Sequence, residues 1–118
     1  MQAPGRYDMT VYQGANFDIT LTWETGDPAT AVNLTGYTGR MQLRPSVDSP
    51  TTTLSLTTSN GRMALGGSAG TIALTISAAD TAALSAGYYV YDLELVSPGT
   101  VVTRLVEGRV TVSAEVTR

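Results

Sequence analysis

Cysteine and histidine are both absent from this chain of 118 residues. Without cysteine, neither a disulfide nor a thiolate metal site can form. Without histidine, the chain lacks the commonest general base and the commonest metal ligand. Lysine is absent as well, so all seven basic residues are arginines. Two explanations for the use of arginine instead of lysine remain open. One is genomic base composition, and the other is selection for planar, bidentate contacts at interfaces.

Charged residues and long apolar runs are scarce. Charged residues make up 14% of the chain, and a net charge of −3 without a basic patch disfavours binding to nucleic acid. No apolar run approaches the roughly twenty residues of a membrane span. Residues 1–6 contain no apolar core of a signal peptide. We therefore expect a complete, soluble, cytoplasmically made chain without membrane partners, folded as one domain over 1–118.

Threonine takes the place of the missing charges, with nineteen residues. Its β-branched, half-polar side chain suits the solvent-facing side of a strand. Several segments alternate apolar and polar residues with period 2, which predicts strands. They are 6–12, 15–24, 37–44, 52–56, 71–76, 87–96 and 101–113. In 15–24 the apolar stripe, which we expect to be buried, is Phe17, Ile19, Leu21 and Trp23. The ring N–H of Trp23 is expected to find a hydrogen-bond partner.

The C-terminal third predicts a hairpin. Two alternating runs between Gly87 and Val112 are joined by a turn at 97–100. In the second run the apolar residues change phase, and Gly108 lies between the two phases. We therefore predict a β-bulge near Glu107–Gly108.

A single short helix is expected just before this hairpin. Ser77 and Asp80 have the spacing of a capping box ahead of an alanine-rich segment, which predicts one helical turn near residues 78–84. The complete pattern predicts an all-β fold, an immunoglobulin-like antiparallel β-sandwich. A tyrosine at 88, 89 or 91 either bonds through its hydroxyl to upstream backbone or simply packs. Residues 1–6 are expected to form an N-terminal arm and 114–118 a frayed tail.

Reactive groups in a catalytic or metal-binding arrangement are not evident. Asp92 and Glu94 lie two apart on one strand face, where pairing with Arg104 or Arg109 is favoured over glycosidase chemistry. Asp27 and Asp48 lie in loops, without the spacing of a calcium loop. The glycine-rich segment 66–70 lacks the lysine of a phosphate loop and is expected to be a mobile hairpin tip. We therefore predict no catalytic residue, no metal site, no cofactor and no enzyme activity.

Arginines and tyrosines are the residue types in this chain best suited to contacts with partners. The candidate interface residues are Arg6, Tyr7, Tyr12, Arg40 and Arg44. Edge-to-edge or head-to-tail pairing through the N-terminal segment is one assembly device that this set allows. An alternative use of the aromatic residues is a sugar-stacking platform, for which Tyr12 is the exposed candidate because Tyr7, Trp23 and Tyr37 lie on inward-facing positions.

Four segments carry a resemblance to known proteins: PGRYDMTVYQGANFDITLTW, VNLTGYTGRMQLR, GTIALTISAADTAALSAGYYVYDLELV and RLVEGRVTVS. They resemble a family of small phage-encoded β-sandwich virion proteins and, more loosely, the N-terminal domain of siphophage upper-baseplate proteins. The shared pattern includes A-G-x-Y-x-Y-D-L-E-L and a final G-x-V-x-V strand. It contains no catalytic motif.

The resemblance implies a structural component of a virion, made in the host cytoplasm. A position at the tail tip or baseplate is expected, and decoration of the capsid is the alternative. Its partners would be other virion proteins or further copies of this chain. A carbohydrate-binding module for host attachment is the alternative from another class, with glycan as the ligand.

Overall fold

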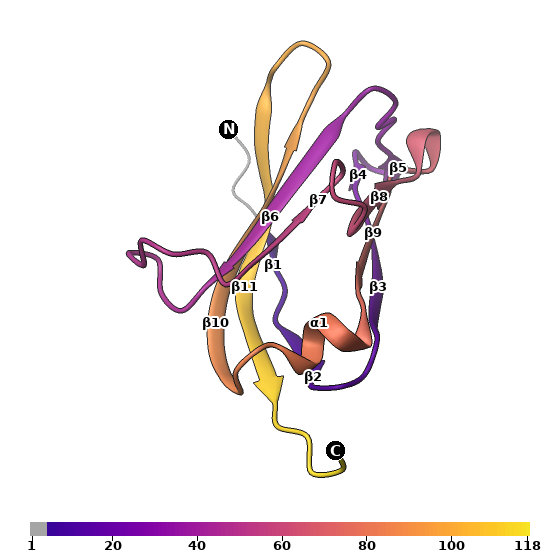
Figure 1. Ribbon diagram of the computed structural model, residues 1–118. Helices are drawn as coiled ribbons and strands as arrows, with labels where there is room; N and C mark the ends of the chain where they lie inside the picture. Colours follow the sequence, from indigo (N-terminus) through magenta and orange to yellow (C-terminus); the bar gives the residue numbers. More distant parts are fainter. Residues whose placement is uncertain (1–4) are drawn as a thin grey trace.

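The C-terminal hairpin forms the centre of the largest sheet in the computed structural model, which describes residues 5–118 (Figure 1). Strands β10 (Gly87–Val96) and β11 (Val102–Ser113) pair antiparallel along their whole length. Strand β6 (Thr38–Arg44) pairs antiparallel with the other side of β10, and β7 (Leu54–Thr57) completes that edge. The predicted hairpin is therefore confirmed.

The N-terminal strands run parallel to the last strand. Both β1 (Gly5–Arg6) and β2 (Met9–Tyr12) pair with β11 in parallel register, so the six-stranded sheet is mixed. The prediction of a purely antiparallel fold is wrong, because period-2 alternation looks the same whichever way a neighbouring strand runs. The predicted arm 1–6 also changes, since Gly5 and Arg6 belong to the sheet. Residues 1–4 of that arm lie outside the described residues.

A second, smaller sheet faces the first. Its three antiparallel strands are, in spatial order, β3 (Phe17–Thr22), β9 (Thr71–Ile76) and β8 (Met63–Leu65). The two short strands β4 (Glu24–Thr25) and β5 (Thr30–Ala31) form a separate pair. A 3₁₀ helix, η1 (Gly67–Ala69), makes the tip between β8 and β9, where the sequence predicts a mobile loop.

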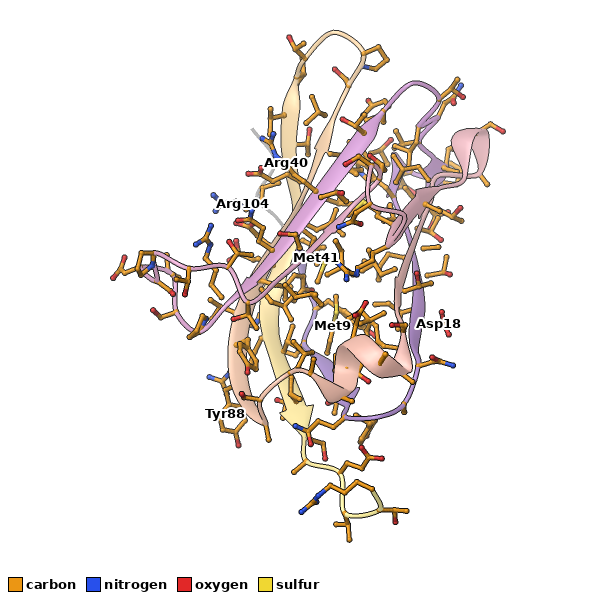
Figure 2. The ribbon with its side chains drawn as sticks, in the orientation of Figure 1. Met9, Asp18, Arg40, Met41, Tyr88 and Arg104 are labelled. Atoms are coloured by element: carbon orange, nitrogen blue, oxygen red, sulfur yellow. The ribbon has the colours of Figure 1, made fainter. Side chains whose placement is uncertain are left out.

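One apolar core lies between the two sheets. Met9 and Met41 point into it from the larger sheet (Figure 2). The apolar stripe of β3 is only half-buried, which corrects the expectation of a fully buried stripe. The reason is position, because β3 is an edge strand of a three-stranded sheet. Trp23 packs edge-on against Tyr37, and among the described residues no acceptor binds its Nε1, contrary to the prediction.

The short helix α1 (Ala78–Ala82) bridges the two sheets at one end (Figure 1). The Ser77 hydroxyl accepts a hydrogen bond from the Asp80 amide at 3.2 Å, which confirms Ser77 as the N-cap of the predicted helix. Thr81 is fully buried, and its hydroxyl donates to the Ala15 carbonyl at 2.9 Å. The same oxygen accepts from the Gly14 amide at 3.1 Å, so the helix is tied to the loop before β3.

A β-bulge is present in β11, two residues before the predicted Glu107–Gly108. Leu93 pairs with Val106 and Glu94 with Arg104, which leaves Leu105 as the extra residue. The phase of the apolar residues changes directly at Leu105–Val106, so the bulge does not need the glycine. Gly108 serves a different purpose, because a Cβ there would collide with the main-chain carbonyl of Tyr7.

The tyrosines of β10 combine packing with hydrogen bonding. The Tyr89 hydroxyl donates to the Ser85 carbonyl at 2.5 Å, so for this tyrosine the alternative of a bond to upstream backbone is the correct one. Tyr91 is buried as well, whereas Tyr88 is 69% exposed. Residues 114–118 form no helix or strand, as predicted, although the Glu115 amide donates to Gln13 Oε1. Within residues 5–118, no helix is long and apolar enough to cross a membrane.

Candidate interaction surface

The outward side of the six-stranded sheet gathers most of the arginines. Because side chains alternate along each strand, the register places them on one face. We call this surface the arginine face; its charged members are Arg6, Asp8, Arg40, Arg44, Asp92, Glu94, Arg104, Glu107 and Arg109. Figure 2 shows Arg40 and Arg104 pointing away from the core on this side. Five of the seven arginines therefore lie on a single sheet surface.

Ion pairs connect neighbouring strands across this face. Arg40 Nε lies 2.8 Å from Glu94 Oε1, and Arg104 Nε lies 3.5 Å from Asp92 Oδ2. Arg104 also approaches Glu107 at 3.7 Å. The predicted pairing of Asp92 is confirmed, but Glu94 pairs with the β6 arginine instead of one on β11. Exposed pairs of this kind contribute roughly 0–1 kcal/mol each, so their main effect is to hold the side chains in place.

Two arginines of the face have no carboxylate partner among the described residues. The Arg44 guanidinium donates to Gln42 Oε1 at 2.8 Å and to the Ser49 carbonyl at 2.9 Å. The Arg109 guanidinium lies over the Tyr88 ring, 5.5 Å from its centroid. Both arginines lie beside Val90 in one row of the sheet, on the strands to either side of β10. Two usual strand spacings therefore separate their Cα atoms, a distance of about 10 Å. Their positive charges are therefore available to an external carboxylate or other anion.

A groove of about 560 Å³ runs over this part of the face. Val90 is one of its lining residues, and Arg44 and Arg109 line it from the neighbouring strands. Val47, from the loop between β6 and β7, contributes an apolar side chain that is 83% exposed. The carboxylates of Asp92, Glu94 and Glu107 also line the groove. It thus combines charges of both signs with apolar contacts, which is a composition suited to a protein partner.

The structure brings four of the five predicted interface residues to this face. Arg6, Arg40 and Arg44 lie within it, and Tyr12, which is 61% exposed, lies at its end on β2. Tyr7 has the opposite phase, although its ring is 43% exposed. The prediction that Tyr7 faces inward is therefore correct for the side of the strand, but the residue is not buried.

Sequence reasoning missed two residues that define the groove. The sequence predicts Arg109 only as a possible ion-pair partner, and it predicts no role for Val47. The alternation of β11 contains the signal for Arg109, since Glu107 and Arg109 share one side of the strand. The signal for Val47 is not in the sequence, because the loop reaches the groove only through its tertiary path.

The described residues contain no group of three or more carboxylates that could hold a metal ion. Asp27 and Asp48, the loop residues considered for calcium, do not form such a group. The pKa of the Asp80 carboxyl is lowered mainly by a 2.8 Å hydrogen bond from Arg62 and further by Ser77. Asp80 lies in the first turn of α1, outside the groove.

No protein-family model matches this chain. No curated protein matches it either.

Proposed function

We propose that this protein is a non-enzymatic structural component of a bacteriophage virion, placed at the tail tip or baseplate. The observation that carries the proposal is the arginine face, an ordered, charged sheet surface that presents two unpaired guanidiniums. Such a surface suits repeated contacts with other proteins more than chemistry on a small molecule. The family resemblance of the β10–β11 segment points the same way.

An immunoglobulin-like sandwich is part of this proposal. When β3, β9 and β8 are taken as strands B, E and D, the small sheet has the order of that fold. Strands β7, β6, β10 and β11 then correspond to C′, C, F and G of the second sheet. The Tyr89 hydroxyl bond to Ser85 near the start of β10 resembles a tyrosine corner. The chain departs from antibody domains in having no cysteine pair.

Virion composition tests the function. Mass spectrometry of purified virions of the encoding phage is expected to detect the protein at a fixed copy number per particle. Its absence from carefully purified particles would rule the proposal out. Gold labelling of an added epitope then separates the tail from the head, where a signal spread over the capsid would favour the alternative of a decoration protein.

Carbohydrate binding is a second candidate, favoured by two exposed tyrosines on the arginine face. Tyr12 and Tyr88 are 61% and 69% exposed, and both lie toward the end of the sheet near the C-terminus of β11. Exposed rings on one face provide surfaces on which sugars stack. A glycan array tests this candidate, with Tyr12→Ala and Tyr88→Ala as variants. Binding that both substitutions abolish would support it, and an array without signal would dispose of it.

A further inference from the structure

The side of the molecule opposite the arginine face carries mostly short, uncharged side chains. It is the outward side of the three-stranded sheet, which we call the threonine face. Its members are Asp18, Thr20 and Thr22 of β3, Ala64 of β8, and Thr71, Ala73 and Thr75 of β9. Figure 2 shows Asp18 on the far side of the core from Arg40 and Arg104. Asp18 is the only charged residue in this set.

Charge is distributed unevenly between the two sides. The arginine face has five arginines against four carboxylates, an excess of one positive charge. The rest of the chain has two arginines and six carboxylates, an excess of four negative charges, which together give the net charge of −3. Asp18 is exposed, and no arginine pairs with it among the described residues. Unpaired charges of opposite sign therefore lie on opposite faces of one molecule.

We infer that copies of this protein stack head to tail, with the threonine face of one copy on the arginine face of the next. Asp18 of one copy would lie over Val90 of its neighbour, between the Arg44 and Arg109 guanidiniums. The separation of about 10 Å between the two arginine Cα atoms, set by strand spacing, allows both long side chains to reach one carboxylate. This inference rests on the proposed structural role and names the partner, a second copy of the same chain.

The side chains of the threonine face suit such a contact. Threonine and alanine are short, so the sheet backbone can approach a facing surface closely. Thr20 and Ala73 form one cross-strand row, and Asp18 and Thr75 form the next. The hydroxyls can also bond to the polar side chains that surround the groove, among them Gln42. No large side chain on β3, β8 or β9 points outward to prevent the approach.

The size of the contact predicts a weak pair. Two strands of six residues and one of three cover about 240 Å² from standard strand dimensions, well below the roughly 800 Å² per partner of a stable interface. A contact of this size becomes stable when many copies are held on a common support, which raises their effective concentration. Because the two surfaces differ, the contact is heterologous and generates rings or open stacks instead of closed dimers.

A charge exchange provides the test. Arg44→Asp/Arg109→Asp makes both faces acidic, and Asp18→Arg makes both faces basic. In analytical ultracentrifugation at up to about millimolar protein, the wild-type chain is expected to self-associate at 0.15 M salt. Association should weaken in 1 M salt, where the Debye length is about 3 Å instead of about 8 Å. Each variant alone should associate at least tenfold more weakly, and an equimolar mixture should recover the wild-type association.

The control for Asp18→Arg is Asp27→Arg. It changes the net charge of the chain by the same amount, but in the exposed turn between β4 and β5. It should associate like the wild type. Circular dichroism melting checks that every variant is folded. Variants that associate normally, or a mixture that associates no better than its components, would overturn the inference. So would a wild-type chain that stays monomeric, or one that binds only a different virion protein; in both cases detection of the protein in virions would leave the proposed function standing.

Discussion

The hydroxyl oxygen of Tyr91 lies 2.5 Å from the main-chain carbonyl oxygen of Tyr7, a residue 84 positions earlier. This bond fastens the N-terminal segment to the centre of the large sheet, at the point between β1 and β2. The backbone there also approaches β11, where the Asp8 carboxylate accepts from the Arg109 amide at 2.9 Å. Two side chains far apart in sequence thus hold the parallel pairing in place.

Replacement of Tyr91 by phenylalanine is expected to lower the free energy of unfolding by about 1 kcal/mol at neutral pH, through loss of this hydrogen bond. Burial, and then the nearby Asp8 carboxylate, raise the pKa of Tyr91 well above its ordinary value of 10.0. Above pH 10 the unfolded chain loses this proton while the folded chain keeps it, so stability falls as pH rises.

Urea unfolding at pH 8 and pH 11 measures both effects. The wild-type chain should lose more stability between these two values than Tyr91→Phe does. Tyr88→Phe, at an exposed position, is the control and should keep the wild-type difference. Equal pH dependence in the wild-type chain and Tyr91→Phe would show that Tyr91 ionises freely in the folded state.

Replacement of Gly108 by alanine is expected to displace the N-terminal strand. The added methyl group would meet the carbonyl oxygen of Tyr7 and the Asp8 side chain, so the cost should be about 1–3 kcal/mol, as for other overpacked sites. Hydrogen exchange should show faster exchange of the β1 and β2 amides. Gly99→Ala, in an open turn whose nearest atom is 3.8 Å away, should change neither quantity; a harmless Gly108→Ala would contradict the close approach.

Replacement of Thr81 by valine is expected to cost about 1–3 kcal/mol, because it leaves the Gly14 amide and the Ala15 carbonyl without the buried hydroxyl. Valine preserves the shape of the side chain, so lost packing does not explain the effect. Thr81→Ser retains the hydroxyl and should cost less. Chemical denaturation of the two variants compares them, and a more stable valine variant would show that these bonds contribute little.

Replacement of Asp80 by asparagine is expected to make the stability of the protein depend less on pH in the acidic range. The Arg62 hydrogen bond, followed by that of Ser77, lowers the pKa of Asp80 below 3.8. The resulting stabilisation is present above that value and disappears as pH falls, because the folded state then takes up the proton. Thermal melts from pH 2.5 to 6 should show a smaller change for Asp80→Asn, while Asp48→Asn, in an exposed loop, should follow the wild type.

Much of the local structure was predictable because its causes are local. The capping pair Ser77 and Asp80 placed α1, and the alternation after Gly87 separated the buried and exposed residues of β10. The arginines of the candidate interface were likewise predictable as a residue type. That these arginines lie on one face of the sheet was not predictable, because Arg40 and Arg109 lie on strands that are connected only through β10.

The sequence by itself determined where the longer strands lie, which side of each is apolar, and where the α-helix forms, because pleat and capping depend on neighbours within a few residues. The tertiary structure alone decided that the first strands run parallel to the last, that Leu105 is the bulged residue, and that β3 is an edge strand with a half-buried stripe. The tertiary structure also decided which arginines of the arginine face have no carboxylate as an ion-pair partner. These features depend on which distant segments become neighbours, and a pattern of period 2 contains no information about the partner or its direction.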